Sequence, residues 1–171
     1  FQTSDNRRED FRDLCLYSTW VKWATPKAEA LRQACLAQES RISHAPPELP
    51  EVFINEIQVS NCKFLGPLVM EFNRQYNAII GGRGTGKSTI LEYLRWALCD
   101  QPPVFDDETD VPDFQGRRRK LVANTLASVN GMVQIRFTVN GVPHVVRRNS
   151  ISNELMLKIG TAEFAECNEG D

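Results

Sequence analysis

The pattern of hydrophobic and polar positions divides the chain at a proline-rich segment. Three prolines fall within Pro46–Pro50, and such a segment cannot continue a helix and is typical of a boundary. We therefore expect three parts: a first unit at residues 1–43, a linker at 44–51 and a larger unit at 52–171.

The first unit has the pattern of one strand followed by one helix. Cys15–Trp23 is rich in aromatic and β-branched residues, which favour a strand. Thr25 then predicts a helix start as the N-cap, with Pro26 at the first helical position. An apolar stripe at a spacing close to 3.6 residues supports this helix, and it consists of Ala30, Leu31, Ala34 and Cys35.

The larger unit contains five segments with the pattern of strands. They are Phe53–Val59, Leu68–Phe72, Val133–Val139, Val142–Arg147 and Leu155–Ile159. Gly66-Pro67 predicts a turn between the first two segments. Asn140-Gly141 lies between the third and fourth, and this dipeptide is the strongest short-range signal for a β-hairpin. We therefore expect antiparallel pairing in this unit.

A short apolar strand and an amphipathic helix are predicted in the middle of the larger unit. Tyr76–Ile80 is the strand, and it leads directly into glycines. Ser88–Cys99 is the helix, with one apolar face made of Ile90, Leu91, Leu94, Ala97 and Leu98. Gln101–Gly116 is rich in proline and aspartate and is predicted as a loop, and Arg118–Ser128 as a short helix.

The segment between this strand and this helix carries the chemistry. It reads Gly81-Gly82-Arg83-Gly84-Thr85-Gly86-Lys87-Ser88, followed by Thr89, and it fits the Walker A pattern G-x-x-x-x-G-K-[ST]. Glycines permit backbone angles that turn consecutive N–H groups toward a phosphate, and a helix N-terminus favours anions. A plain glycine turn needs neither four glycines nor the Lys-Ser pair.

Each position of this motif has a chemical role. Lys87 is expected to reach the β- and γ-phosphates, Ser88 to place its hydroxyl on Mg²⁺, and Thr89 to contact the α-phosphate. The sequence therefore predicts a site for a nucleoside triphosphate, namely ATP with Mg²⁺.

Composition restricts the remaining classes. The 171 residues are 42% hydrophobic and 25% charged with a net charge of −2, which is ordinary for a globular domain and argues against a dedicated nucleic-acid wrapper. Five scattered cysteines without C-x-x-C spacing predict reduced, mostly buried thiols. We expect a cytoplasmic chain with no membrane span, cut from a longer protein, because it begins with neither Met nor a signal peptide.

Ordered motifs in the larger unit resemble a known ATPase lobe. They are Ile54-x-x-Ile57-x-Val59-x-Asn61-Cys62-Lys63-Phe64, Met70-x-Phe72 and Asn77-x-Ile79-Ile80-Gly81. With the loop, they make Val52–Ser150 resemble the N-terminal lobe of SMC/RecN-like ABC-type ATPases. The resemblance implies an α/β P-loop fold with a mixed sheet, an antiparallel β-subdomain and the loop helix on one face. It also implies that Asn61, Lys63 and Phe64 approach the nucleotide, although these positions also suit an ordinary sheet edge.

A narrower resemblance extends into the first unit. It is carried by Ser4-Asp5-Asn6, Thr19–Lys22, Glu29-x-Leu31–Ala34, Glu39–Ile42 and the glycine loop. These residues resemble the TrlF-like proteins, which fuse a PHP-type metal-dependent phosphoesterase domain to an SMC-like ATPase. The resemblance implies that residues 1–43 are the tail of a PHP-like domain. Arg7 stands where the metal motif would have histidine, so we predict no metal site there, and Ser4-Asp5 is interpreted as a helix cap.

Two elements of ABC-type hydrolysis have no counterpart in the sequence. The resemblance implies an apolar strand ending in Asp-Glu and a Ser-Gly-Gly signature loop from a second subunit, and the chain contains neither. We therefore expect a Walker A lobe that hydrolyses ATP only when a C-terminal lobe and a second copy complete it. The resemblance implies a DNA-associated setting such as repair or anti-phage defence, with a homodimer on ATP binding and DNA as a partner.

Two other functions remain open from the sequence. One is a P-loop small-molecule kinase or GTPase-type protein, and the other is an interaction module that binds nucleotide without turnover. Kinases and GTPases have an essentially parallel sheet, so the predicted antiparallel pairs favour the ATPase lobe.

Several residues outside the loop have structural as well as functional interpretations. The basic run Arg117–Lys120 suits either a contact with DNA or a solvated helix start. Arg147 and Arg148 end a strand, so one is expected to face the nucleotide side and the other to face solvent. Tyr93 and Trp96 lie three residues apart on the loop helix, which predicts packing against a neighbour, and His144 is interpreted as a sheet residue.

Overall fold

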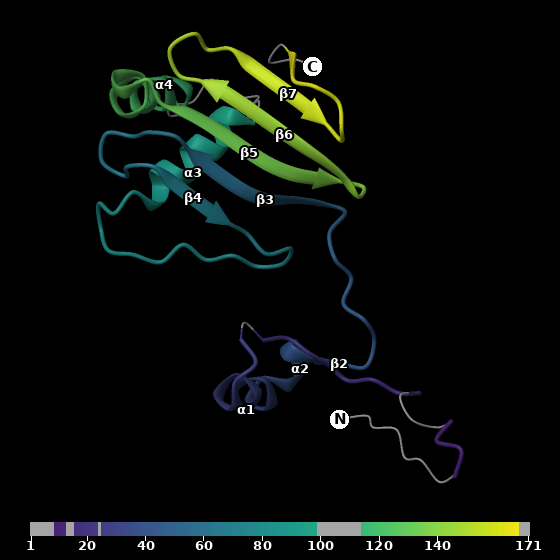
Figure 1. Ribbon diagram of the computed structural model, residues 1–171. Helices are drawn as coiled ribbons and strands as arrows, with labels where there is room; N and C mark the ends of the chain where they lie inside the picture. Colours follow the sequence, from purple (N-terminus) through teal and green to yellow (C-terminus); the bar gives the residue numbers. More distant parts are fainter. Residues whose placement is uncertain (1–8, 13–15, 24, 99–113, 168–171) are drawn as a thin grey trace, which may run out of the picture. The chain divides into compact units, whose positions relative to one another are not determined.

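The computed structural model describes residues 9–12, 16–23, 25–98 and 114–167. Contacts within the chain divide it into two compact units, Phe1–Leu49 and Pro50–Asp171 (Figure 1). The predictions for Ser4-Asp5, Arg7, Cys15 and Cys99, and for most of the loop at 101–116, lie outside the described residues. Each unit is considered separately below.

The first unit contains a two-stranded antiparallel sheet and two short helices. β1 (Trp20–Val21) pairs with β2 (Ile42–Ser43), and α1 (Ala28–Leu36) and α2 (Gln38–Arg41) lie between them in the chain. The predicted strand at 15–23 is therefore wrong except for its two residues in β1. β2 has only two residues and can pair with no more, so aromatic and β-branched composition alone does not extend the strand.

The start of α1 differs from the prediction. The backbone N–H of Lys27 donates to the carbonyl of Thr25 at 2.8 Å, which forms a tight turn. Because this turn precedes the helix, the N-cap is Lys27 and the first helical residue is Ala28. No side chain caps α1, so the predicted capping by Thr25 with Pro26 as the first helical residue is wrong.

The second unit is built on a six-stranded sheet in the order β4-β3-β5-β6-β7-β8. The strands are β3 (Val52–Val59), β4 (Leu68–Glu71), β5 (Met132–Val139), β6 (Val142–Asn149), β7 (Leu155–Ile159) and β8 (Ala165–Glu166). Every pair in this described sheet is antiparallel. The five predicted strands are confirmed, whereas the two-residue β8 is too short to leave a pattern.

The turn between β5 and β6 has the geometry that its sequence predicts. Asn140 and Gly141 have φ of 49° and 80°, both in the left-handed region. Two consecutive left-handed residues match a type I′ turn, whose twist suits a two-residue hairpin. Val139 and Val142 are therefore paired directly across the turn.

Two helices cover one face of the sheet, namely α3 (Lys87–Ala97) and α4 (Phe114–Thr125) (Figure 1). A short 3₁₀ turn, η1 (Ala127–Val129), follows α4 in the chain. The core lies between this face and the helices, and its fully buried side chains include Ile57, Ile135 and Leu126. The loop helix on one face of an α/β lobe is as predicted. Residues 114–116, expected in a loop, instead begin α4.

The buried face of α3 is rotated relative to the prediction. Tyr93 and Trp96 are buried with Ile90 and Ala97, whereas Leu91 and Leu98 are 51% and 37% exposed. Aromatic side chains remove more apolar area from water than leucine does. The helix therefore turns its aromatic residues into the core, and the expected packing of Tyr93 and Trp96 is confirmed.

The predicted strand at Tyr76–Ile80 is not a strand. None of its residues pairs with a described strand, and Tyr76 and Ile80 are 78% and 92% exposed. Ile79 packs against the hydrophobic core, but an extended segment without backbone partners in a neighbouring strand does not form a strand. The parallel pairing that a mixed sheet requires is accordingly not among the described pairs.

The described cysteines are not mostly buried, contrary to the prediction. Cys62 is buried, Cys35 is exposed, and Cys167 is half-buried. None of the helices in the described ranges is long and apolar enough to cross a membrane.

Candidate functional site

The glycine loop at residues 81–86 ends at an uncapped helix N-terminus. Gly84 and Gly86 have φ of +80° and +87°, a region that residues with a Cβ rarely adopt. Gly86 is the N-cap of α3, and no side chain donates or accepts a capping bond there. The first amides of α3 are therefore left open at the loop.

These open amides form a row. In the described part of the chain, the N–H groups of Gly86, Lys87, Ser88 and Thr89 donate to no acceptor, and the first backbone bond runs from Ile90 N–H to Gly86 O at 3.0 Å. Unpaired amides at a helix N-terminus combine with the helix dipole to create positive potential. This end of α3 therefore favours an anion.

Two of the glycines are required by close contacts. A Cβ on Gly86 would lie 2.5 Å from Leu65 Cδ2, and a Cβ on Gly81 would lie 2.7 Å from Thr85 Oγ1. Real Cβ atoms do not approach other atoms this closely. The absence of side chains thus lets the loop fold tightly on itself and pack against the segment between β3 and β4.

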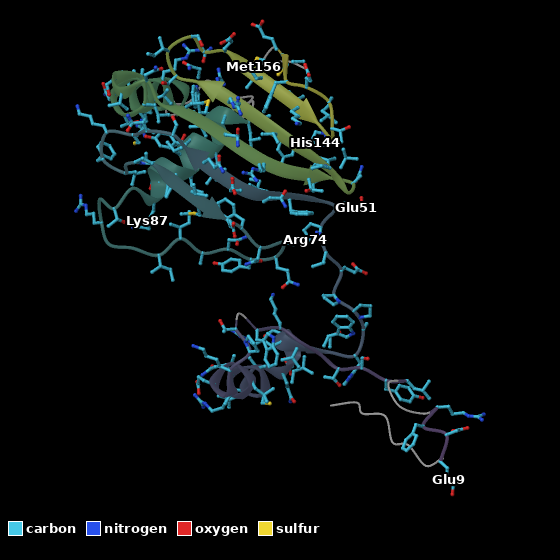
Figure 2. All side chains as sticks on the ribbon, viewed as in Figure 1. Glu9, Glu51, Arg74, Lys87, His144 and Met156 are labelled. Atoms are coloured by element: carbon cyan, nitrogen blue, oxygen red, sulfur yellow. The ribbon has the colours of Figure 1, made fainter. Side chains whose placement is uncertain are left out.

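Lys87 folds back over the loop that precedes it. Its Nζ donates to Gly81 O at 2.7 Å and also to Gly82 O. An ammonium group has three donors, so these two bonds leave one N–H for a further acceptor. Figure 2 labels Lys87 at the end of the sheet opposite His144, which follows the β5–β6 turn. The bonds to Gly81 O and Gly82 O thus hold the lysine ammonium group against the glycine loop, which leads into the open amides of α3.

The remaining motif residues are accessible. Ser88 and Arg83 are exposed, Thr89 is half-buried, and the hydroxyls of Ser88 and Thr89 bond to no described residue. Thr85 is also exposed, and its hydroxyl donates to Gly82 O at 2.9 Å. The hydroxyls of Ser88 and Thr89 are thus available to a ligand at the helix N-terminus.

The predicted nucleotide-contacting residues between β3 and β4 do not behave alike. The side-chain amide of Asn61 donates to Val129 O at 3.2 Å, so this group already has a structural partner. The Lys63 and Phe64 side chains are exposed, with Phe64 at 63%. Because the next residue, Leu65, packs against Gly86, this segment adjoins the glycine loop.

Buried polar contacts that the sequence did not reveal fasten α3 to its surroundings. The Tyr93 hydroxyl donates to Thr125 Oγ1 at 2.6 Å and lies 2.9 Å from Cys62 Sγ. Burial, with the Cys62 hydrogen bond, raises the pKa of Tyr93 far above its ordinary value. The phenol therefore stays neutral and serves as a hydrogen-bonding bridge between α3, α4 and the segment after β3.

The C-terminal end of α3 is held by a buried arginine. Arg148 is 4% exposed, and its Nη1 donates to the carbonyl of Trp96 at 2.7 Å. Its guanidinium carbon lies 4.9 Å from the centre of the Trp96 ring. A cation at a helix C-terminus complements the dipole, so Arg148 stabilises α3 from the sheet. No pattern in one sequence predicts a contact across 52 positions.

An ion pair joins α3 to α4. Arg118 Nε donates to Glu92 Oε2 at 2.8 Å, and Arg95 lies 3.1 Å from the other carboxylate oxygen. Burial opposes ionisation of Glu92, but its bonds to Arg118 and Arg95 outweigh this and lower its pKa. One member of the basic run at 117–120 therefore has a structural role, while Arg117, Arg119 and Lys120 are exposed.

Two other sequence candidates are structural. His144 lies on β6 and stacks on Phe137 with ring centroids 5.1 Å apart, so its interpretation as a sheet residue is confirmed. Arg147 projects from the face opposite Arg148, as expected. There it donates to Gln134 Oε1 and lies over the Phe164 ring at 4.3 Å. His144 and Arg147 therefore belong to the sheet and not to the glycine loop.

The residues at the loop fit a nucleotide polyphosphate better than a metal held by protein ligands alone. Among the described residues, no group of three His, Cys, Asp or Glu side chains could hold a metal ion. The loop offers four open amides, an ammonium group and two free hydroxyls instead. Donors of this kind suit phosphate oxygens, and a hydroxyl beside them suits Mg²⁺ that arrives with the phosphates.

The α/β lobe and its glycine loop before α3 together define a P-loop nucleotide-binding protein. Residues 56–168 match the family described as the AAA domain, which is about two thirds of the chain. The chain therefore belongs to this family of ATP-binding ATPase domains.

No curated protein matches the chain. Among solved structures, one similar chain comes from work on the structural biochemistry of ATP-driven dimerization and DNA-stimulated activation of SMC ATPases. It has a TM-score of 0.40 and 16% sequence identity, and the match covers 69% of this chain and 74% of that chain.

Proposed function

We propose that this chain is the ATP-binding, Walker A lobe of an SMC-like ATPase. In this proposal, the loop at residues 81–89 holds the phosphates of ATP. The amides of residues 86–89 would donate to phosphate oxygens, and Lys87 would contribute its remaining N–H and its charge. The observation that carries the proposal is this combination of open amides and a positioned ammonium at one uncapped helix N-terminus.

The metal is assigned to the nucleotide and not to a protein cage. Ser88 would contribute its hydroxyl to Mg²⁺, and Thr89 would contact the α-phosphate. When bound with ATP, Mg²⁺ neutralises phosphate charge. The exposed, unbonded Ser88 hydroxyl supports this role.

The base would lie toward the segment between β3 and β4. Phe64 is exposed and offers a ring face for stacking, and Lys63 offers a cation beside it. Their position next to Leu65, which packs on Gly86, supports this placement. Asn61 is the weakest member of the set because its amide is bonded to Val129 O.

Turnover requires groups that this chain does not supply. Phosphoryl transfer needs charge neutralisation and an oriented water from several directions, and the sequence has no Asp-Glu strand end and no signature loop. We therefore assign hydrolysis to an assembly completed by a C-terminal lobe and a second copy that joins on ATP binding. The wholly antiparallel pairing of the described sheet supports this over a kinase or GTPase.

The biological setting rests on the sequence resemblance alone. A cytoplasmic location is part of the proposal as well, and the resemblance implies DNA-associated work such as repair or anti-phage defence. It also makes residues 1–43 the tail of a PHP-like domain, joined by a linker at 44–51 to the ATPase lobe at 52–171.

Titration calorimetry tests the central proposal. ATP with millimolar Mg²⁺ should bind the chain, and Lys87→Ala should weaken binding about 10- to 100-fold, because a charge-assisted contact contributes about 1.5–3 kcal/mol. Arg119→Ala is the matched control, since it removes an exposed cation from α4 and should leave the affinity unchanged. Absence of heat with the unmodified chain would refute the proposal.

Two measurements test assembly and turnover. Light scattering of the protein that includes the C-terminal lobe should show dimers with ATP and with a non-hydrolysable analogue. The Lys87→Ala variant of that protein should stay monomeric under the same conditions. The isolated 171-residue chain should have negligible ATPase activity, and robust turnover that depends on Lys87 would contradict this part of the proposal.

A further inference from the structure

The carbonyl of Gly82 accepts two side-chain donors that come from different positions of the loop. Thr85 Oγ1 donates to it at 2.9 Å, and Lys87 Nζ donates to it as well as to Gly81 O. A carbonyl oxygen has two lone pairs, so these two donors saturate it. One peptide group thereby connects the Thr85 hydroxyl to the lysine that defines the motif.

The side chain of Thr85 also occupies the space over the first two glycines. A Cβ on Gly81 would lie 2.7 Å from Thr85 Oγ1, and a Cβ on Gly82 would lie 3.9 Å from Thr85 Cγ2. Thr85 is nevertheless exposed, and among the described residues its hydroxyl bonds to Gly82 O and to no core residue. Its hydroxyl therefore acts on the loop itself and not on the packing of the lobe.

Without this hydroxyl, the first part of the loop would have few restraints. Glycine is the most flexible residue, so Gly81 and Gly82 lose more conformational entropy than others when they are fixed. Lys87 would then be their one remaining side-chain donor among the described residues. If the free loop is mobile, it loses conformational entropy when the ligand binds, and this loss weakens the affinity.

We propose that Thr85 is a positioning residue that fixes the Gly82 carbonyl, and through it Lys87, before a polyphosphate arrives. This inference rests on the proposed function of the loop and assigns a role to one residue of the same site. Thr85 does not touch the ligand in this account. It shapes the free protein, so its removal slows association and leaves dissociation unchanged.

The chain offers a matched pair of substitutions for the test. Thr85→Val keeps the shape and removes the hydroxyl, whereas Thr85→Ser keeps the hydroxyl. Stopped-flow fluorescence with a fluorescent ATP analogue and Mg²⁺ measures both rate constants, and pyrophosphate competition measures the affinity for the phosphate part alone. Thermal unfolding shows whether each variant is folded, and Thr85→Ala replaces Thr85→Val if the latter is not.

The expected result separates the hydroxyl from the methyl group. Thr85→Val should lower the association rate constant and the pyrophosphate affinity about 3- to 10-fold, the range for one neutral hydrogen bond. Its dissociation rate constant should be unchanged. Thr85→Ser should match the unmodified chain in both rate constants and in the affinity for pyrophosphate. A faster dissociation would overturn the inference, because Thr85 would then contact the ligand. Equal binding by Thr85→Val, or a Thr85→Ser variant as weak as Thr85→Val, would also overturn it.

Failure of this inference is distinguishable from failure of the proposed function. If the unmodified chain binds no nucleotide, the proposed function fails. If it binds and Thr85→Val binds equally fast, only the role of Thr85 fails.

Discussion

β3 and the segment Tyr76–Ile80 have similar apolar patterns, yet only β3 is a strand. β3 is paired on both sides, with β4 and with β5, and its Ile57 is fully buried. Ile80 is 92% exposed, and its segment pairs with no described strand. The difference shows that a strand pattern gives a strand only where neighbours supply backbone partners and a covering face.

In the chain, the glycine loop comes directly after the Tyr76–Ile80 segment and not after a strand of the sheet. The Asn77 side chain holds the start of this segment, since the backbone N–H of Asn73 donates to Asn77 Oδ1 and Asn77 Nδ2 donates to the backbone carbonyl of Asn73, both at 2.9 Å. At its other end, the loop is held by α3, whose core face is buried. The candidate site therefore depends for its position on α3, and also on Leu65 and Ile79, which pack against the core beside Gly86 and just before the loop, respectively.

The largest expected contrast is between equivalent substitutions in these two regions. Ile57→Ala should lower the free energy of unfolding by about 2–5 kcal/mol, because it removes a buried side chain and leaves a cavity. Ile80→Ala should change it by less than about 0.5 kcal/mol, as for other exposed positions. Urea denaturation of both variants measures this, and comparable losses would mean that Ile80 is packed in solution.

A second contrast uses two glycines with the same backbone strain. Gly86 and Gly141 have φ of +87° and +80°. A Cβ added at Gly86 would lie within 4 Å of Leu65, whereas a Cβ added at Gly141 would meet no atom within that distance. Gly141→Ala should cost about 1–2 kcal/mol for the left-handed backbone. Gly86→Ala should cost about 1–3 kcal/mol more, because the added methyl displaces Leu65.

The same pair separates stability from binding. Gly86→Ala should also weaken ATP binding in calorimetry, because the displaced loop carries the open amides, whereas Gly141→Ala should bind normally. Equal stability losses with equal binding would show that Leu65 does not restrain the loop.

Local patterns were sufficient for much of the fold. The hairpin at Asn140-Gly141 and the strand β3 were predictable because turn chemistry and alternation act over a few residues. The orientation of α3 was not, because its sequence has two overlapping apolar faces. One contains Leu91 and Leu98, the other Tyr93 and Trp96, and the packing partners decide between them.

The candidate site divides in the same way. The glycines, Lys87 and Ser88 could be read from the sequence because the phosphate loop is contiguous. The contacts that hold its helix could not, since Tyr93 meets Thr125 and Trp96 meets Arg148 only after the chain has folded. The segment at 76–80 was mispredicted because its pattern describes its own preference and says nothing about the presence of a neighbour.

The smallest expected effect concerns Glu92, which fastens the loop helix to α4. Its pKa is lowered in the folded chain from an ordinary value of 4.5, since the bonds to Arg118 and Arg95 outweigh burial. A lowered pKa means that the ion pair stabilises the fold above pH 4.5 and that this contribution is lost as the pH falls through the folded value. Because the carboxylate is 30% exposed, the contribution should be at most about 1 kcal/mol.

Glu92→Gln tests this sign, because the amide cannot ionise. The variant should be less stable than the unmodified chain at pH 7, and the difference should shrink as the pH falls below 4.5. Glu29→Gln is the control, since Glu29 also pairs with an arginine but belongs to the first unit and not to the unit that contains α3. If the stability difference for Glu92→Gln stayed constant from pH 7 to pH 3, the pair would not link α3 to α4 through charge. The hold on α3 would then come from Tyr93 and Arg148, whose contacts do not require an ionised carboxylate.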